Sequence, residues 1–142
     1  MKFSSRKDIL FTTIILGVIV FVIGLTLIEI LKGEVQQDEY WVFPIILAVL
    51  GLLLWMFFGT NYELSKDGFI YRSGPINGKI SIHRIHEIVK GKTTWIGLKP
   101  ATARNGLLIK YDKYNEVYIS PKSNEAFIKQ ILELKNDIII SE

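Results

Sequence analysis

Two long apolar runs lie close together near the start of the chain and constrain its fold more than any other feature. Residues 9–31 contain 17 Ile, Leu, Val or Phe side chains, and their single charge, Glu29, lies near the far end. Residues 41–59 contain no charged residue, and Trp41 and Trp55 lie near the two ends of this run, as in the aromatic belts of spanning helices. Because about 20 apolar residues cross a bilayer as a helix, the sequence predicts transmembrane helices at 9–31 and 41–59.

The charges that flank these runs predict their orientation. Three of the residues in the N-terminal flank, 1–8, are Lys or Arg, whereas the connecting loop, 32–40, has one Lys and three acidic residues. The remaining 13 Lys and Arg residues follow the second run. The positive-inside rule therefore predicts a multi-pass cell-membrane protein with both termini cytoplasmic and a short external loop. A signal peptide is the rejected alternative, since the first run is too long and no small-residue cleavage site follows it.

Small residues follow one face of each predicted helix. Thr13, Gly17 and Gly24 are spaced by four and seven residues, and Ala48 and Gly51 provide a similar face on the second helix. Small residues let helix backbones approach closely in membranes. We therefore expect the two helices to pack through these faces, with a homo-oligomer through the same faces as the alternative.

Composition restricts the partners of the chain. Its 142 residues are 49% hydrophobic with a mean hydropathy of +0.30, and the excess is concentrated in the two apolar runs. The net charge of +3 fits a domain held near anionic lipid and is too small for a dedicated nucleic-acid binder, so no nucleic-acid partner is expected. Since the chain has no cysteine, thiolate metal sites and cysteine nucleophiles are excluded.

After residue 59 the pattern changes to short strand-like segments separated by turn residues, followed by one amphipathic helix. Ser123 is the expected helix N-cap, and Phe127, Ile131 and Leu134 share one helix face. Residues 60–142 are therefore expected to form an α+β domain, a small β-barrel of about seven antiparallel strands with a C-terminal capping helix. The predicted strands are Tyr62–Ser65, Phe69–Ser73, Lys79–His83, Ile85–Lys90, Thr93–Leu98, Leu107–Tyr111 and Glu116–Ser120.

Several short motifs in this region resemble the bacterial PH-like domains of the YyaB type, over roughly residues 60–137. The chain departs from the family pattern before the sixth strand, where Ala103 and Gly106 replace a Ser and an Arg. The resemblance implies a PH-like fold and a membrane location, and it implies no reaction. The matching segments are Tyr62-Glu63-Leu64, Asp67-Gly68, Gly74, Lys79-Ile80-Ser81-Ile82, Ile85–Ile88, Leu107-Leu108-Ile109-Lys110-Tyr111, Val117-Tyr118-Ile119-Ser120-Pro121-Lys122 and Phe127-Ile128.

One basic stretch is a candidate contact site for a protein partner or for lipid headgroups. Its residues are Lys90, Lys92, Trp95, Lys99 and Arg104. Cations near an anionic lipid surface each contribute about 1 kcal/mol, and an exposed tryptophan suits a membrane or partner contact. The alternative is a solvated loop with Trp95 packed on the core.

No residue pattern for catalysis is present. The two histidines, His83 and His86, have only Glu87 nearby as a third metal ligand, and no catalytic or phosphate-binding motif occurs. We therefore expect no enzymatic activity, no cofactor and no metal. The favoured function is a membrane-anchored PH-like binding or scaffold module that recruits a protein partner or contacts lipid headgroups at the cytoplasmic face. The alternatives are a bacteriocin-immunity or envelope-stress protection protein and an accessory subunit of a membrane enzyme or transporter.

Overall fold

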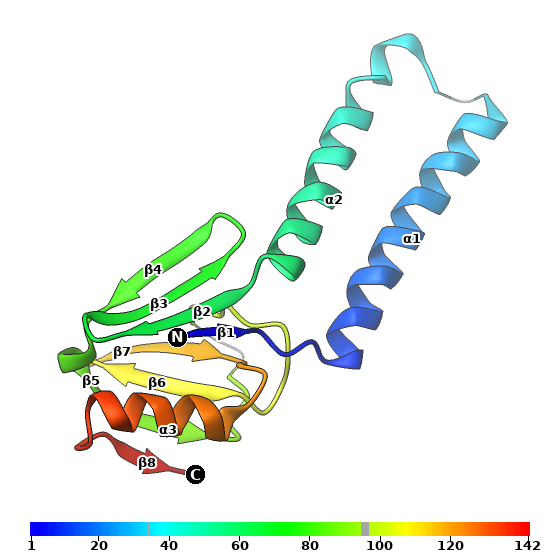
Figure 1. The fold of residues 1–142 in the computed structure, drawn as a ribbon. Coiled ribbons are helices and arrows are strands. Elements are labelled where there is room, and N and C mark those ends of the chain that lie inside the picture. The colour runs from blue at the N-terminus through cyan, green and yellow to red at the C-terminus, as the bar shows by residue number, and fades with distance from the viewer. Residues whose placement is uncertain (34, 95–96) are drawn as a thin grey trace.

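The computed structural model describes residues 1–33, 35–94 and 97–142. Two long helices form a hairpin that projects from a β-rich domain (Figure 1). Helix α1 covers Ile9–Lys32 and helix α2 covers Val42–Phe58, and the 3-10 turn η1, Gln37–Glu39, precedes α2. Helix α1 and the continuous segment Gln37–Phe58, which consists of η1 and α2, are both long and apolar enough to cross a membrane. The ends of both helices lie within one residue of the ends of the two apolar runs.

Local signals set the ends of α1. The Asp8 carboxylate is the N-cap and accepts a hydrogen bond of 3.4 Å from the Leu10 backbone N–H. The helix ends at Gly33, whose positive φ of 69° lets its N–H bond back to the last turn. Inside the helix, the Thr26 hydroxyl donates to the Val22 carbonyl at 2.8 Å, so this polar group is satisfied within the apolar run.

The predicted packing of the helices through small residues is wrong. A Cβ atom placed on Gly17, Gly24 or Gly51 would meet no neighbouring described atom within 4 Å. The partly buried side chains of each helix instead recur every three or four residues and so lie on one face of the helix. Most of these side chains are larger than the glycine and alanine residues of the predicted contact. This face includes Thr12, Ile15, Ile19, Val22 and Thr26 on α1, and Phe43, Ile46, Leu50, Leu53 and Phe57 on α2.

The domain consists of two four-stranded sheets and one helix. The first sheet has the order β1-β2-β3-β4 and is antiparallel, and the second has the order β7-β6-β5-β8, with β5 and β8 parallel. The 3-10 turn η2, Ile82–Arg84, connects β4 to β5. The strands are β1 (Lys2–Ser4), β2 (Asn61–Ser65), β3 (Gly68–Ser73), β4 (Ile76–Ile80), β5 (Ile85–Lys90), β6 (Leu107–Tyr111), β7 (Asn115–Ile119) and β8 (Ile139–Ser141).

Helix α3, Asn124–Leu134, covers the core between the sheets. The Ser123 hydroxyl accepts a hydrogen bond of 3.2 Å from the Ala126 N–H, which confirms the predicted N-cap. Phe127 is fully buried, and its ring packs edge-on against Phe69 at 5.5 Å and against Phe3 at 5.3 Å between centroids. The predicted fold class, two long helices followed by a PH-like β-rich domain with a C-terminal helix, is confirmed.

Some strand limits differ from the prediction. Strand β4 begins at Ile76 and ends at Ile80, instead of covering Lys79–His83, because a two-residue turn at Gly74 and Pro75 pairs Ser73 with Ile76. The predicted strand Thr93–Leu98 includes residues 95 and 96, which lie outside the described residues. Among its other residues, only Leu98 makes a β-bridge, with Val117. Strands β1 and β8 were not predicted.

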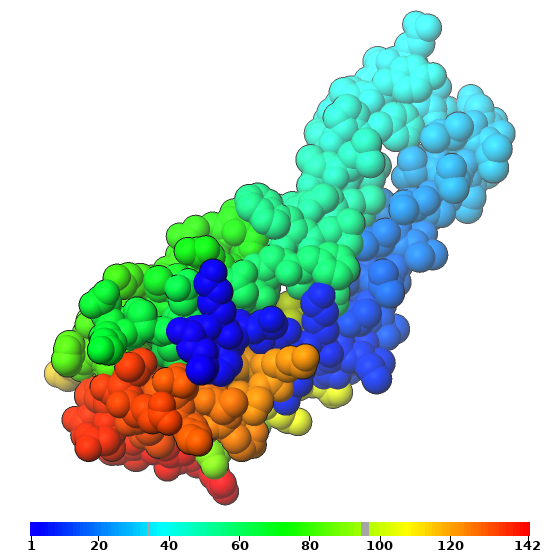
Figure 2. Space-filling view, viewed as in Figure 1, coloured from blue at the N-terminus to red at the C-terminus, as the bar shows by residue number. Residues whose placement is uncertain are grey.

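Strand β1 connects the two sheets, although it precedes both long helices in the chain. One edge of β1 pairs with β2, from Lys2 opposite Glu63 to Ser4 opposite Asn61. On the other side, the Lys122 N–H donates to the Ser4 carbonyl at 3.0 Å, and Ser5 forms a bridge with Pro121. Figure 2 shows these N-terminal residues, in dark blue, lying between the green and orange parts of the domain. The domain is therefore built from chain segments that precede α1 and that follow α2.

Candidate membrane-proximal site

Four buried hydroxyl groups hold the segment between β1 and α1 against the domain. The Ser5 Oγ lies 3.2 Å from Tyr62 Oη, 2.9 Å from Thr102 Oγ1 and 3.0 Å from Ser120 Oγ. Tyr62 is fully buried, its hydroxyl donates to the Pro100 carbonyl at 2.5 Å, and burial raises the pKa of this phenol. This hydroxyl cluster, defined by Ser5, Tyr62, Thr102 and Ser120, brings residues 100–105 beside the start of α1.

The end of α2 is attached to the same part of the domain. The Thr60 hydroxyl lies 2.5 Å from the Met56 carbonyl and 2.8 Å from the Ser73 hydroxyl. The β3–β4 turn approaches α2 so closely that a Cβ on Gly74 would lie 2.7 Å from Met56 Cγ. The Lys7 ammonium lies 4.1 Å from the centroid of the Phe58 ring. Both helices therefore leave the domain from one face, which we call the membrane-proximal face.

A hollow with basic walls lies where α1 leaves this face. It has a volume of about 370 Å³ and is lined by Arg6, Lys7, Asp8, Ile9, Arg104 and Asn105. We call it the basic hollow, because three of these residues are cations and one is a carboxylate.

Two sets of contacts fix the charges of the basic hollow. The Arg104 Nε donates to the Asp8 carboxylate at 2.8 Å, and this hydrogen bond lowers the pKa of Asp8 below its usual value. The Arg6 Nη2 donates to the backbone carbonyls of Arg104 at 2.5 Å and Asn105 at 3.0 Å. The Asn105 carbonyl also accepts from the Asn124 amide at 3.0 Å. The guanidinium of Arg6 is thus oriented by the loop that carries Arg104.

The structure brings one of the predicted contact residues to the basic hollow. Arg104 lines it, whereas Lys90 lies at the end of β5, with its ammonium 4.0 Å from the Glu142 carboxylate. Lys92 is exposed, Lys99 is partly buried, and neither lines the hollow. Trp95 lies outside the described residues, so its predicted contact is not described.

Sequence reasoning missed three residues that line the basic hollow with Arg104. In the sequence, Arg6 and Lys7 are signals of membrane orientation only, and no motif singles out Asp8. The one local signal was Asp8 itself, a typical N-cap residue directly before an apolar helix. Nothing in the spacing of residues 6 and 104 indicates that they meet, because their proximity depends on β1.

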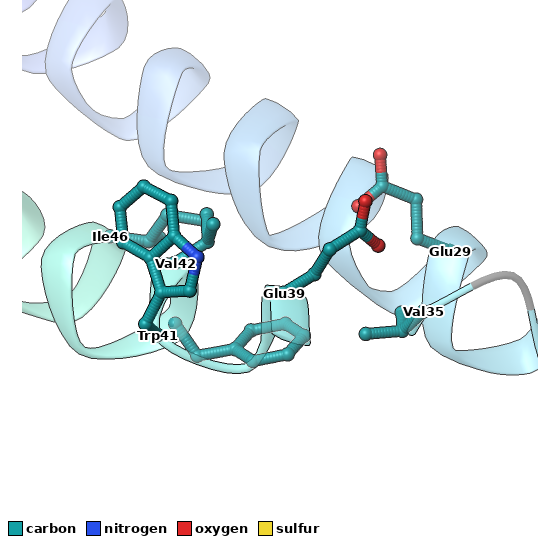
Figure 3. A pocket seen from close by; sticks show the side chains of 7 residues that line it. Glu29, Val35, Glu39, Trp41, Val42 and Ile46 are labelled. Atoms are coloured by element: carbon teal, nitrogen blue, oxygen red, sulfur yellow. The ribbon is translucent and has the colours of Figure 1, made fainter. Parts of the chain in front are cut away.

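A second cavity lies between the helices at the end far from the domain (Figure 3). It has a volume of about 440 Å³, and its lining includes two acidic residues, Glu29 from α1 and Glu39 from η1. The Glu39 carboxylate already accepts the Gln36 N–H at 3.2 Å as part of the cap of η1. The other residues that line this cavity are apolar: Val35, Trp41, Val42, Phe43 and Ile46.

The two histidines lie away from both cavities. The His86 Nε2 lies 2.8 Å from the Asp112 carbonyl oxygen, and His83 is exposed in η2. Asp112 also forms an ion pair with Arg84, which lowers the pKa of this carboxyl group. Among the residues that the structure describes, no group of three or more His, Asp or Glu side chains is arranged to hold a metal ion.

Comparison with known families shows what the domain is similar to. Residues 60–135, more than half of the chain, match the family described as Bacterial PH domain. The comparisons with curated proteins and with solved structures found no match. The matched residues include the strands from β2 to β7 and all of α3, but they do not include β1 or the long helices.

Proposed function

This chain belongs to the bacterial PH domain family, and on that premise we propose that it is a membrane-anchored, non-enzymatic binding module. Helices α1 and α2 cross the membrane, and the membrane-proximal face of the domain contacts lipid headgroups on the cytoplasmic side. PH-like domains are typically non-catalytic binding modules, which supports the general class.

The observation that carries this proposal is the basic hollow at the start of α1. Three cations, Arg6, Lys7 and Arg104, line it together with Ile9, the first residue of the helix. Cations at this level of a membrane protein face the phosphate groups of the lipids and are attracted to an anionic leaflet. Trp55 and Phe58 are exposed near the end of α2, as expected for aromatic side chains at the membrane interface.

The attachment of the domain supports a persistent contact with the membrane. β1 pairs with β2 ahead of α1, and the Thr60 hydroxyl lies within hydrogen-bonding distance of the Met56 carbonyl and the Ser73 hydroxyl where α2 ends. Because the chain is tied down at both helix ends, the domain cannot swing away on a flexible linker. The excess of Lys and Arg at the N-terminal flank and in the domain supports a cytoplasmic location.

A quenching experiment on the full chain tests the contact. Because the chain has no cysteine, one fluorophore can be placed through Pro75→Cys, in the exposed turn beside α2, or through Asn115→Cys, at the far end of β6 and β7. In nanodiscs that contain a headgroup-labelled quencher lipid, we expect strong quenching at position 75 and weak quenching at position 115. Equal quenching at the two positions would contradict the proposal.

A second candidate function is recruitment of a protein partner by strand addition to β4. This strand pairs only with β3 among the described residues, so its other edge is open. Asn77 and Lys79 are exposed there, and an added strand would use the free backbone groups of β4. A photo-crosslinking residue at position 79 should then give protein adducts in cells, whereas one at Tyr114, in the exposed turn between β6 and β7, should not.

A further inference from the structure

We propose that the basic hollow holds the phosphate group of one anionic phospholipid molecule. This inference rests on the proposed headgroup contact and adds to it a defined site for a single lipid. The chemistry that the hollow offers is guanidinium and ammonium donors for a phosphate, beside an apolar helix surface for an acyl chain.

The charge of the basic hollow favours an anion. Arg6, Lys7 and Arg104 provide three positive charges, and Asp8 provides the single negative charge. The Asp8 carboxylate accepts a hydrogen bond from Nε of Arg104. Among the described residues, Nε is the only nitrogen of this guanidinium that has a hydrogen-bond partner. The other nitrogens of Arg104 therefore retain donors for a ligand, and the side chain is 48% exposed.

The cations are held in place before a ligand arrives. Two backbone carbonyls fix the guanidinium of Arg6, and Asp8 fixes that of Arg104. Asn105, which has a positive φ of 52°, carries one of these carbonyls, and Asn124 supports it. Side chains that are already ordered lose less entropy on binding, and planar guanidinium groups match the oxygens of a phosphate.

The apolar wall of the hollow distinguishes a phospholipid from free phosphate. Ile9 lines the hollow and is 82% exposed, and Leu10 beside it is 40% exposed. Both residues begin α1, so a phosphate bound to the cations would place its acyl chains along the apolar surface of this helix. Free phosphate would leave that surface in water, and the hollow therefore fits a membrane lipid better.

Native mass spectrometry of the full chain in detergent tests the site with a series of pure lipids. We expect one molecule of phosphatidylglycerol to remain bound in preference to phosphatidylcholine, whose choline cation opposes the cations of the hollow. An excess of inorganic phosphate should not displace it. Equal retention of both lipids, or complete displacement by inorganic phosphate, would overturn the proposal, and this series needs no variant protein.

Matched variants then locate the site. The double variant Arg6→Gln/Arg104→Gln should weaken phosphatidylglycerol retention about ten-fold, since two charge-assisted contacts are lost. The control Lys90→Gln/Lys92→Gln removes the same charge outside the hollow and should retain the lipid like the wild type. Equal loss in both variants would show non-specific attraction and overturn the site.

The quenching experiment separates this site from the proposed function. If phosphatidylglycerol is not retained but a label at position 75 is still quenched more than one at 115, the headgroup contact stands and the lipid site fails. If both positions are quenched equally, the proposed function itself fails.

Discussion

Ser5 and Ser120, which are 115 residues apart in the chain, lie with their hydroxyl oxygens 3.0 Å apart inside the domain. Ser5 precedes α1, whereas Ser120 follows β7, so this hydrogen bond joins the two sides of the helical hairpin. The Arg6 N–H strengthens the same connection by donating to the Ser120 carbonyl at 2.7 Å. The segment before α1 is therefore a structural part of the domain that follows α2.

Replacing the buried Ser5 hydroxyl should destabilise the domain. Ser5→Ala removes contacts with Tyr62, Thr102 and Ser120, and we expect a loss of about 1–2 kcal/mol in the free energy of unfolding. Thermal unfolding of the full chain in detergent measures this. Ser4→Ala, in the exposed part of β1, should change the stability by less than about 0.5 kcal/mol and serves as the control.

The buried phenol of Tyr62 predicts a loss of stability at high pH. Burial raises its pKa above the usual value of 10.0 for a tyrosine, so the folded chain retains a proton that the unfolded chain releases once the pH exceeds about 10. Stability should therefore fall as the pH rises above that value. Tyr62→Phe should flatten this fall, at a cost of about 1–3 kcal/mol at neutral pH from the lost hydrogen bonds to Pro100 and Ser120. Tyr114→Phe, at an 86% exposed position, should leave the alkaline slope unchanged.

The ion pair of Asp8 predicts an effect at low pH. Arg104 lowers the pKa of Asp8, so the stabilisation is fully present above the unfolded value of about 3.8 and is lost as the pH falls through the lower folded value. Unfolding between pH 2 and 5 by circular dichroism should show a shallower acid slope for Asp8→Asn than for the wild type. An unchanged slope would mean that this pair does not help attach α1; Asp67→Asn in the β2–β3 turn is the matched control.

The close approach of Gly74 to α2 predicts a coupled effect of two substitutions. Gly74→Ala adds a Cβ at a φ of 58° and 2.7 Å from Met56 Cγ, and we expect a loss of about 1–2 kcal/mol from the left-handed backbone alone. Met56→Ala removes the side-chain part of the clash. The loss in the free energy of unfolding of the double variant should therefore be smaller than the sum of the losses of the two single variants. Strictly additive unfolding free energies would show that the turn does not press on α2.

Cysteine accessibility tests the proposed topology directly. In whole cells, Gln36→Cys in the predicted external loop should react with an impermeant maleimide, whereas Asn115→Cys in the domain should react only after the membrane is permeabilised. Both positions lie outside the long helices, and both are exposed. Labelling of the two positions from the same side of the membrane would exclude the two-helix hairpin with cytoplasmic ends.

Most elements were predictable because their signals are local. Apolar runs predicted α1 and α2, short strand-like segments bounded by turn residues predicted β5 and β6, and Ser123 with Phe127 predicted α3. Strands β1 and β8 could not be predicted in this way, since each has three residues and pairs with distant strands. Phe3 is the one residue of β1 that packs on the core, and a single apolar residue shows no periodicity.

The basic hollow was only partly predictable for the same reason. Arg104 belongs to a visibly basic stretch, so sequence reasoning could select it. Arg6 and Lys7 lie about a hundred residues away and reach the hollow because β1 pairs with β2 and the hydroxyl cluster holds residue 5. A contact of this kind depends on the tertiary structure, and one sequence does not reveal it.

The position of β1 has a consequence for the order in which the protein is made. Its residues are synthesised before the two long helices, yet their partners, β2 on one side and Pro121 and Lys122 on the other, appear only after both helices have left the ribosome. A chain whose N-terminal flank was translocated to the wrong side of the membrane could not supply this strand. Its domain would expose the edge of β2 and lack Phe3 beside Phe127, which makes it a target for proteolysis. In the membrane topology proposed above, the pairing of β1 would thus make survival of the folded protein depend on correct membrane insertion.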